Sequence, residues 1–211
     1  MNKEENVPTN DTSKFQLICA GIMALFAAMG VLSSTYSGIT ATDWLNSSQV
    51  AAQTYAWYQA KSIKETIMEG QRNFALSLKK NMVTNPEQTK AINDFVAQTN
   101  KQIERINNDK NEILKGSNNI DKSKWSQDVN GKFGQIVGAK ELDATTQLYS
   151  NSSDYFTYAT VYIQLALVLG ALALIISECI PRHLFFMVMV GLGLYGSYLA
   201  LHGYILYSAV G

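Results

Sequence analysis

Three stretches of the sequence contain no Asp, Glu, Lys or Arg, and they constrain the fold more than any other feature. They cover residues 15–42, 155–177 and 184–211. Each contains a run of about 20 mostly apolar residues, which is enough for a helix to cross about 30 Å of hydrocarbon. The sequence therefore predicts three membrane spans. The ionisable residues are confined to a short tail, one large central block and a tight loop.

We predict an all-α integral membrane protein with an antiparallel helical hairpin as a water-exposed domain between spans one and two. The predicted segments are a disordered cytoplasmic tail (1–14), span one (15–36), an extracytoplasmic hairpin domain (37–154), span two (155–178), a cytoplasmic turn (179–183) and span three (184–208). Span one is expected to be an uncleaved signal anchor, because its apolar run exceeds the roughly 7–15 residues of a signal-peptide core.

The orientation of these spans follows from the few basic residues near their ends. Lys3, Lys14 and Arg182 flank the spans on one side, whereas the segments 36–60 and 138–154 on the other side contain a single Lys. Short loops rich in Lys and Arg stay in the cytoplasm. We therefore expect the N-terminus and the turn to be cytoplasmic and the central block to lie outside.

The central block has a heptad pattern that is typical of paired helices. Asn85 followed by Pro86 predicts the start of a helix, and Gly116 predicts its end. Along this helix the predicted seam repeats in steps of four and three: Ile92, Val96, Thr99, Ile103, Ile106, Lys110 and Ile113. The preceding helix offers a looser matching set: Ala56, Ala60, Ile63, Ile67, Gly70 and Phe74. A short turn at residues 84–85 predicts antiparallel packing of the two helices.

The stretch Trp57-Tyr58-Gln59-Ala60-Lys61-Ser62-Ile63-Lys64 resembles the signature of an uncharacterised bacterial membrane family, the domain of unknown function numbered forty-three thirty-seven. The family layout is similar throughout: one N-terminal span, this helix start, a charged helical middle and two closely spaced C-terminal spans. The family loop between the last two spans is basic, whereas residues 178–183 carry one Glu and one Arg. The resemblance implies a bacterial origin and no catalytic residues. Together with the orientation drawn from the basic residues, it gives a bacterial inner-membrane protein with the central domain in the periplasm.

The candidate interaction patch within this octet consists of Trp57, Tyr58, Lys61 and Lys64. Trp57 and Lys61 are four residues apart, so the ammonium group is expected over the indole ring. Lys61 and Glu65 have the same spacing and are expected to pair. One interpretation is a docking patch for a partner protein or for lipid headgroups. The other is a packed and salt-bridged helix start.

Two polar residues interrupt the apolar spans. Gln164 and His202 each lie roughly two turns into their spans from the same side of the membrane. Buried polar groups are costly in lipid, so we expect an intramembrane hydrogen-bonded pair between them. This pair would serve either a proton or ion step or a purely structural bond between helices.

Small residues predict close helix packing. The predicted helix-packing face of span three consists of Gly193, Gly196, Ser197, Ala200 and Gly203. Span one carries a similar set: Ala20, Ala24, Ala27 and Ala28. Such faces let helices approach closely in lipid. They are used either within one chain or between copies.

Catalysis has few candidates in this sequence. The only histidines are His183 and His202 and the only cysteines are Cys19 and Cys179, all in or beside spans. Common catalytic and phosphate-binding motifs are missing, and there is no basic excess to indicate nucleic acid. We therefore expect no catalytic residues, metal or cofactor. We expect a non-enzymatic scaffold or interaction subunit in the lipid bilayer, which forms a homo-oligomer or is accessory to a larger complex. The alternative is an oligomeric channel or transport accessory protein.

Overall fold

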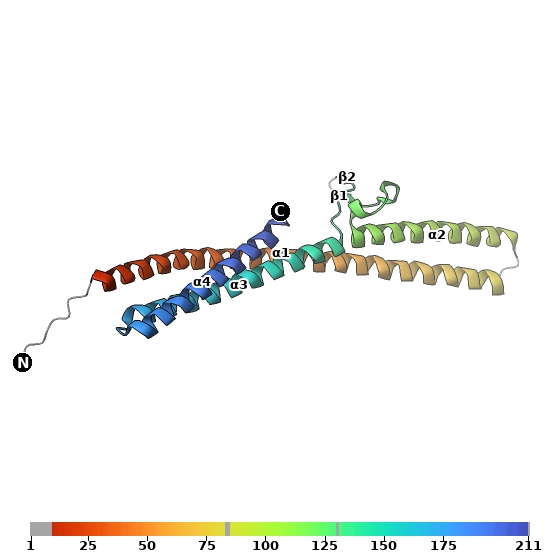
Figure 1. The fold of residues 1–211 in the computed structure, drawn as a ribbon. Coiled ribbons are helices and arrows are strands. Elements are labelled where there is room, and N and C mark those ends of the chain that lie inside the picture. Colours follow the sequence, from red (N-terminus) through yellow and green to blue (C-terminus); the bar gives the residue numbers. More distant parts are fainter. Residues whose placement is uncertain (1–9, 83–84, 130, 211) are drawn as a thin grey trace, which may run out of the picture. The chain divides into compact units, whose positions relative to one another are not determined.

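The computed structural model describes residues 10–82, 85–129 and 131–210 and contains four α-helices (Figure 1). The helices are α1 (Asn10–Met82), α2 (Pro86–Lys115), α3 (Ala139–Ile175) and α4 (Cys179–Ser208). By length and composition, α1, α3 and α4 are long and apolar enough to cross a membrane. The prediction of an all-α chain with three such helices is confirmed.

The helices extend beyond the predicted spans. The first span and the first helix of the central block form the single helix α1, because no proline lies between Pro8 and Pro86 to break it. The second span likewise continues a helix that begins at Ala139. The helix α1 also begins inside the predicted tail, at Asn10. Residues 1–9 of that tail, and Thr84 of the predicted turn, lie outside the described residues.

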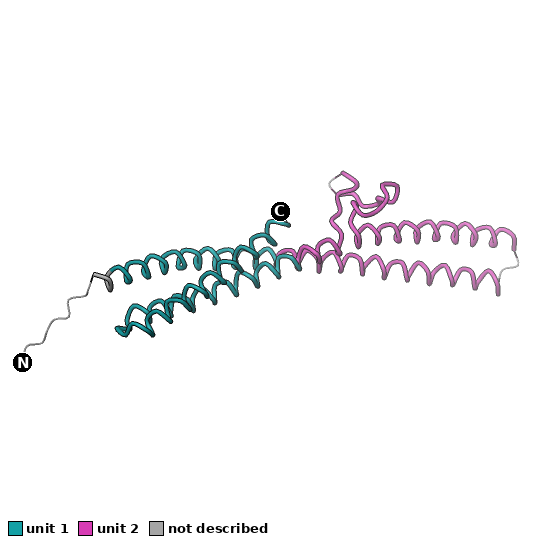
Figure 2. The backbone as a smooth tube through the Cα atoms, in the orientation of Figure 1, with its two compact units in different colours: residues 1–44, 147–211 teal, residues 45–146 magenta. Residues whose placement is uncertain are grey.

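The chain forms two compact units (Figure 2). The first unit consists of residues 1–44 and 147–211 and so combines the N-terminal part of α1 with most of α3 and all of α4. The second unit consists of residues 45–146 and contains the rest of α1, α2 and the first turns of α3.

The core of the first unit is shared by its three helix segments. Cys19 and Phe26 of α1 are buried together with Ile163 and Ala166 of α3 and Met189 of α4. A second cluster combines α3 and α4 at the other end of the unit: Phe156, Ala159, Leu199 and Ala200. Aliphatic and small residues thus alternate along the interface, which allows close interhelical contact.

Glycines bring the backbones of α3 and α4 together in the first unit. A Cβ added at Gly196 would lie 2.8 Å from the Ile163 side chain and 3.0 Å from the carbonyl oxygen of Ala159. Further along α4, Ser152 Oγ donates a hydrogen bond of 2.8 Å to the carbonyl oxygen of Gly203. A side chain at either glycine would therefore push the two helices apart.

In the second unit, α1 and α2 pack antiparallel, as predicted. The Lys61–Asp109 and Lys79–Asn93 contacts join the two helices, and the partner numbers fall on α2 as they rise on α1. Figure 1 shows α2 lying alongside this part of α1. At the start of α2, Asn85 Oδ1 accepts a hydrogen bond of 2.9 Å from the backbone N–H of Glu87. This is the predicted N-cap.

The α2 side of the seam is the predicted one. Thr99, Ile103, Ile106 and Ile113 are buried, and the other predicted positions are half-buried. Asp109 and Glu112 are also buried on this face. Two charged residues therefore share the face with the aliphatic ones, and they require partners there.

The predicted α1 side of the seam is wrong. Its residues are all exposed: Ala56, Ala60, Ile63, Ile67, Gly70 and Phe74. The face of α1 that is covered in the second unit repeats every seven residues instead: Ser47, Thr54, Lys61, Met68 and Ala75. The same repeat is buried in the first unit: Cys19, Phe26, Ser33 and Thr40. The prediction failed because it assumed that the most apolar face of α1 meets α2, whereas small, polar and charged residues do so.

The segment between α2 and α3 folds around one buried carboxylate. Its short elements are two 3-10 turns, Ser117–Asn119 and Lys122–Lys124, and an antiparallel pair of two-residue strands, β1 (Asp128–Val129) and β2 (Lys132–Phe133). Glu112 is fully buried. Its Oε1 accepts a hydrogen bond of 2.8 Å from Ser117 Oγ, and its Oε2 accepts bonds of 2.7 and 2.9 Å from the backbone N–H groups of Ser126 and Gln127.

Replacing Glu112 with Ala should loosen this segment. The change removes the acceptor of several buried donors, and we expect the free energy of unfolding of the second unit to fall by about 3 kcal/mol. The fluorescence of Trp125, whose Nε1 donates to Ser117 O over 2.9 Å, reports the change. Glu104→Ala, at an exposed position of the same helix, is the matched control. Equal stability of the two variants would contradict the proposed role of Glu112.

Replacing Gly196 with Leu should destabilise the first unit. The added side chain meets Ile163 and the backbone of α3, and overpacking of this kind costs roughly 1–3 kcal/mol. Gly191→Leu is the control, because a Cβ there has no atom of the described residues within 4 Å. Thermal unfolding in detergent should show a lower midpoint for Gly196→Leu alone. A similar loss in both variants would indicate a general effect of Leu in α4.

Candidate functional site

Two ion pairs join α1 to α2 at the candidate interaction patch. Lys61 Nζ donates to Asp109 Oδ2, and Lys110 Nζ donates to Glu65 Oε2, each over 2.5 Å. The side chains are 24% and 6% exposed in the first pair and 17% and 16% exposed in the second. In one pair α1 supplies the cation, and in the next it supplies the anion. A shift of α1 along α2 would therefore separate partners, so the pairs help to define the register of the hairpin.

The predicted contacts along α1 are wrong at this patch. Lys61 is bound to α2, not to Trp57 or Glu65 of its own helix. The aromatic–cation contact comes from α2 instead, where Lys110 Nζ lies 5.4 Å from the centre of the Tyr58 ring. Contacts of this kind join two helices, so they depend on the register of the hairpin. Residue spacing along one helix does not reveal that register.

The partners that sequence reasoning missed were Asp109 and Lys110. A signal for them existed, because they follow Ile106 by three and four residues and so share its side of α2. Charged residues at such positions face a partner helix and need an opposite charge on it. Only Lys110 was included in the predicted seam, as an interruption.

A polar groove of about 360 Å³ lies beside the Lys61–Asp109 pair. Its lining combines both helices: Lys61, Lys64, Gln102, Arg105, Ile106 and Asp109. Within the described residues, Asp109 Oδ1 is buried without a hydrogen-bond partner. Of the predicted patch residues, Trp57 and Lys64 are exposed, whereas Tyr58 and Lys61 are half-buried in the seam. Only Trp57 and Lys64 are therefore free to contact another molecule without opening the hairpin.

Hydrogen bonds also join α1 to the first turns of α3 in the second unit. The hydroxyl groups of Ser47 and Thr146 lie 2.8 Å apart, and Tyr55 donates to Asp143 Oδ2 over 2.5 Å. The hydrogen bond to Asp143 raises the pKa of the Tyr55 phenol, because ionisation would remove the donor beside a carboxylate. Both contacts hold α3 close to the seam face of α1.

Gln164 and His202 are not brought together, so the predicted intramembrane pair is wrong. Gly196 of α4 faces Ile163, the residue before Gln164. The part of α4 at the same height as Gln164 is therefore the part around Gly196. His202 lies six residues further on, about 9 Å along the helix axis. Its ring instead lies against that of Tyr155, with ring centres 4.4 Å apart and the planes tilted by 34°. The prediction failed because depth was counted from the predicted span ends rather than from the packing contacts.

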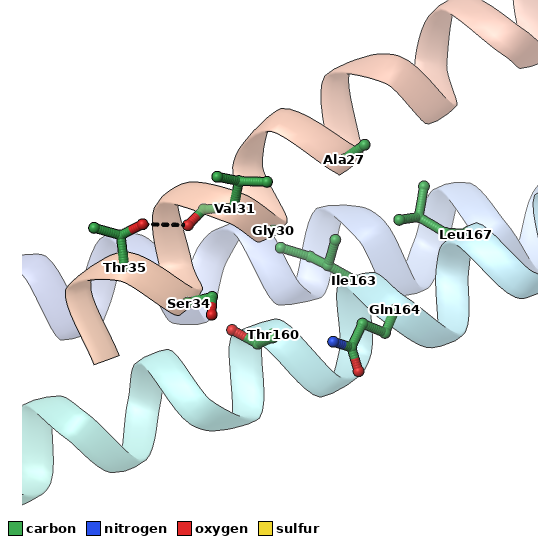
Figure 3. A pocket seen from close by; sticks show the side chains of 9 residues that line it. All are labelled: Ala27, Gly30, Val31, Ser34, Thr35, Thr160, Ile163, Gln164 and Leu167. Carbon is green, nitrogen blue, oxygen red and sulfur yellow. Dashed lines mark hydrogen bonds between the residues drawn. The ribbon is translucent and has the colours of Figure 1, made fainter. Parts of the chain in front are cut away.

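Gln164 lines a groove of about 420 Å³ on the surface of the first unit (Figure 3). The lining comes from α1 and α3: Ala27, Gly30, Val31, Ser34, Thr35, Thr160, Ile163, Gln164 and Leu167. Figure 3 shows the hydroxyl groups of Ser34 and Thr160 pointing toward one another across it. The Thr35 and Thr160 hydroxyl groups are bonded within their own helices and donate to the carbonyl oxygens of Val31 and Phe156, each over 2.9 Å. The groove thus offers an amide and hydroxyl groups on an otherwise apolar surface.

The predicted small-residue face of α4 packs within the chain. Gly193, Gly196, Ala200 and Gly203 are buried and Ser197 is half-buried. Gly193 lies against the ring of Phe26 in α1, and a Cβ there would overlap the ring. The alanine set of span one is exposed: Ala20, Ala24, Ala27 and Ala28. Of the two possible uses of the α4 face, the structure realises the one within a single chain.

No group of three His, Cys, Asp or Glu side chains that could hold a metal ion occurs in the part of the chain that the structure describes. In the segment between α2 and α3, Asp121 caps a 3-10 turn. Hydrogen bonds from Ser123 lower the pKa of the Asp121 carboxyl group. This carboxylate is exposed and has a structural role in the turn.

Removing one member of the Lys61–Asp109 pair should cost more than removing both. Lys61→Met leaves Asp109 buried without its cation, and we expect the free energy of unfolding of the hairpin to fall by about 2–3 kcal/mol. The double variant Lys61→Met/Asp109→Leu should recover at least about 1 kcal/mol of this loss. Chemical unfolding monitored by helicity measures both values. Lys64→Met, at an exposed position nearby, should have little effect, and additive single effects would disprove the coupling.

No curated protein and no solved structure matches the chain. One family model does match, and it covers residues 15–206, which include all of α2 and α3 and most of α1 and α4. Its description is "Domain of unknown function (DUF4337)". The match agrees with the resemblance found in the octet at residues 57–64, and the chain belongs to this family.

Proposed function

We propose that this protein is a non-enzymatic interaction or scaffold subunit of the bacterial inner membrane. In this proposal the three helix segments of the first unit are the membrane anchor. The α1–α2 hairpin of the second unit is the binding arm and lies in the periplasm, with the N-terminus in the cytoplasm.

The observation that carries the anchor is the apolar outer surface of the first unit. Large aliphatic side chains are exposed on all three of its helix segments: Leu17, Leu25, Val31, Val168, Leu172, Ile175, Leu194 and Leu201. The interior combines small residues, such as Ala159 and Gly196, with large apolar ones, such as Phe26 and Ile163. An exposed apolar surface of this extent is unfavourable in water, whereas a bilayer would cover it.

The contacts within the hairpin support the proposal that it is a binding arm. Its seam contains two ion pairs, and the most apolar residues of α1 in this unit remain on the outside. Apolar residues that do not stabilise their own fold are typical of surfaces that bind another protein.

A channel or transport accessory role is the second candidate. The groove lined by Ser34, Thr160 and Gln164 favours it, because these polar groups lie on the outer surface of a bundle that we place in lipid. Polar groups in such positions are satisfied most readily by helices of another chain. Several copies that gathered around these grooves would form a shared polar path.

The anchor and its orientation can be tested with two measurements on membranes. The protein should remain in the membrane fraction after an alkaline wash, and a phosphatase inserted after Lys115 should be active, because periplasmic conditions are needed for its folding. A green fluorescent reporter inserted at the same residue is the control and should stay dark. A bright reporter with an inactive phosphatase would invert the topology. Release by the wash would exclude the anchor altogether.

A further inference from the structure

We propose that the outer stripe of α1 is the interface at which a second copy of this chain binds, through a parallel pair of α1 helices. The outer stripe consists of Ala56, Ala60, Ile63, Ile67, Gly70 and Phe74. The inference rests on the proposed function, which it deepens by naming the partner of the binding arm and the surface that meets it.

The first step is the exposure of this stripe. Ile63, Ile67 and Phe74 are 63%, 54% and 65% exposed, so most of each residue's surface is left uncovered by α2. The stripe repeats in steps of four and three residues, which is the repeat of a coiled-coil seam. A surface with this repeat fits a straight helix that lies along α1, and it fits a globular partner poorly.

The order of large and small residues provides the second step. A side chain on a helix leans toward the N-terminus, so Phe74 covers the turn that contains Gly70. A Cβ added at Gly70 would have no atom of the described residues within 4 Å, so the space beside this glycine is open. In a parallel pair the Phe74 rings of both copies can occupy that space. Ile63 and Ile67 then fill the centre, and Ala60 permits close approach at the other end.

The charges beside the stripe provide the third step. The flanking positions on its two sides are mostly uncharged: Gln59, Thr66, Asn73, Trp57 and Gln71, with Lys64 as the exception. Such flanks have no row of charges that would select an acidic or a basic foreign helix, and they allow an identical helix to approach. In a parallel pair in register, Lys64 lies opposite Gln59 of the second copy. An antiparallel pair centred on the stripe would instead bring the two Lys64 side chains together, which is unfavourable.

The parallel direction also agrees with the proposed anchor. The outer stripe and the apolar N-terminal part belong to the same helix, α1. If every copy enters the same bilayer through that part, the α1 helices of neighbouring copies run in the same direction. Identical stripes then meet at identical heights without any further adjustment.

Cysteine cross-linking in native membranes tests the pairing and its direction. The full chain would carry Cys179→Ser, to remove the exposed thiol, while the buried Cys19 is kept. Ala60→Cys and Phe74→Cys should each give disulfide-linked dimers on mild oxidation, because a parallel pair brings identical positions together. Phe95→Cys, at an exposed position of α2, is the control and should stay monomeric. Cross-linking between Ala60→Cys and Phe74→Cys only when the two are mixed would mean an antiparallel pair and overturn the proposal.

Light scattering in mild detergent provides the second test. The variant Ile63→Gln/Ile67→Gln should weaken self-association at least tenfold, while Phe95→Gln should leave it unchanged. Helicity and thermal unfolding should remain as in the unmodified chain, because the substituted residues are exposed and do not stabilise the hairpin. An assembly of unchanged mass, or one that contains a single copy and a foreign protein, would overturn this interface and leave the proposed function standing. A single chain without any partner would overturn both.

Discussion

Every seventh residue of α1, from Cys19 to Ala75, lies on the inner side of the helix, and the packing of both units depends on this repeat. Seven residues complete slightly less than two helical turns, so this line of residues drifts by about 20° around the helix with each repeat, and the neighbouring helices must wind with it. The chemistry of the face changes along the helix. Cys19 and Phe26 lie among apolar side chains, and the Thr40 hydroxyl bonds the backbone of its own helix. Further along, Ser47 bonds a hydroxyl group of α3, and Lys61 pairs with an anion. One helix can therefore serve two units of different character.

Local signals made much of the fold predictable. Charge-free length identified the three long helices, and Asn85 with its following proline located the start of α2. The buried residues Ile103 and Ile106 followed from spacing alone. The inner face of α1 could not be identified in this way, because its position near Lys61 carries a charge while a more apolar face lies outside. The general tendency of apolar residues to face inward misleads wherever ion pairs close an interface and apolar residues stay exposed on the opposite face of the helix.

The candidate sites were less predictable because they depend on contacts between distant parts of the chain. The depth of His202 is determined by the close approach of Gly196 to α3, which no count from a span end reveals. The role of Glu112 depends on a segment that folds back onto α2 only after Gly116. Before the fold is known, Glu112 resembles any other acidic residue near the end of a helix. Residue type and spacing thus indicated which side chains are unusual, and the packing determined what they contact.

The chain segments that form each unit have a consequence for the order in which contacts can form. The α1–α2 hairpin closes between segments that are adjacent in the chain, so its helix–helix contacts need nothing beyond residue 115. The first unit is different, because its N-terminal segment ends at residue 44 and its other two helix segments lie within residues 147–211. During synthesis, the α1 face that carries Phe26 and Ser33 must wait without its final neighbours until α4 is complete. The contacts between α1 and α2 can therefore form before those of Phe26 and Ser33, although all of these residues of α1 belong to one continuous helix.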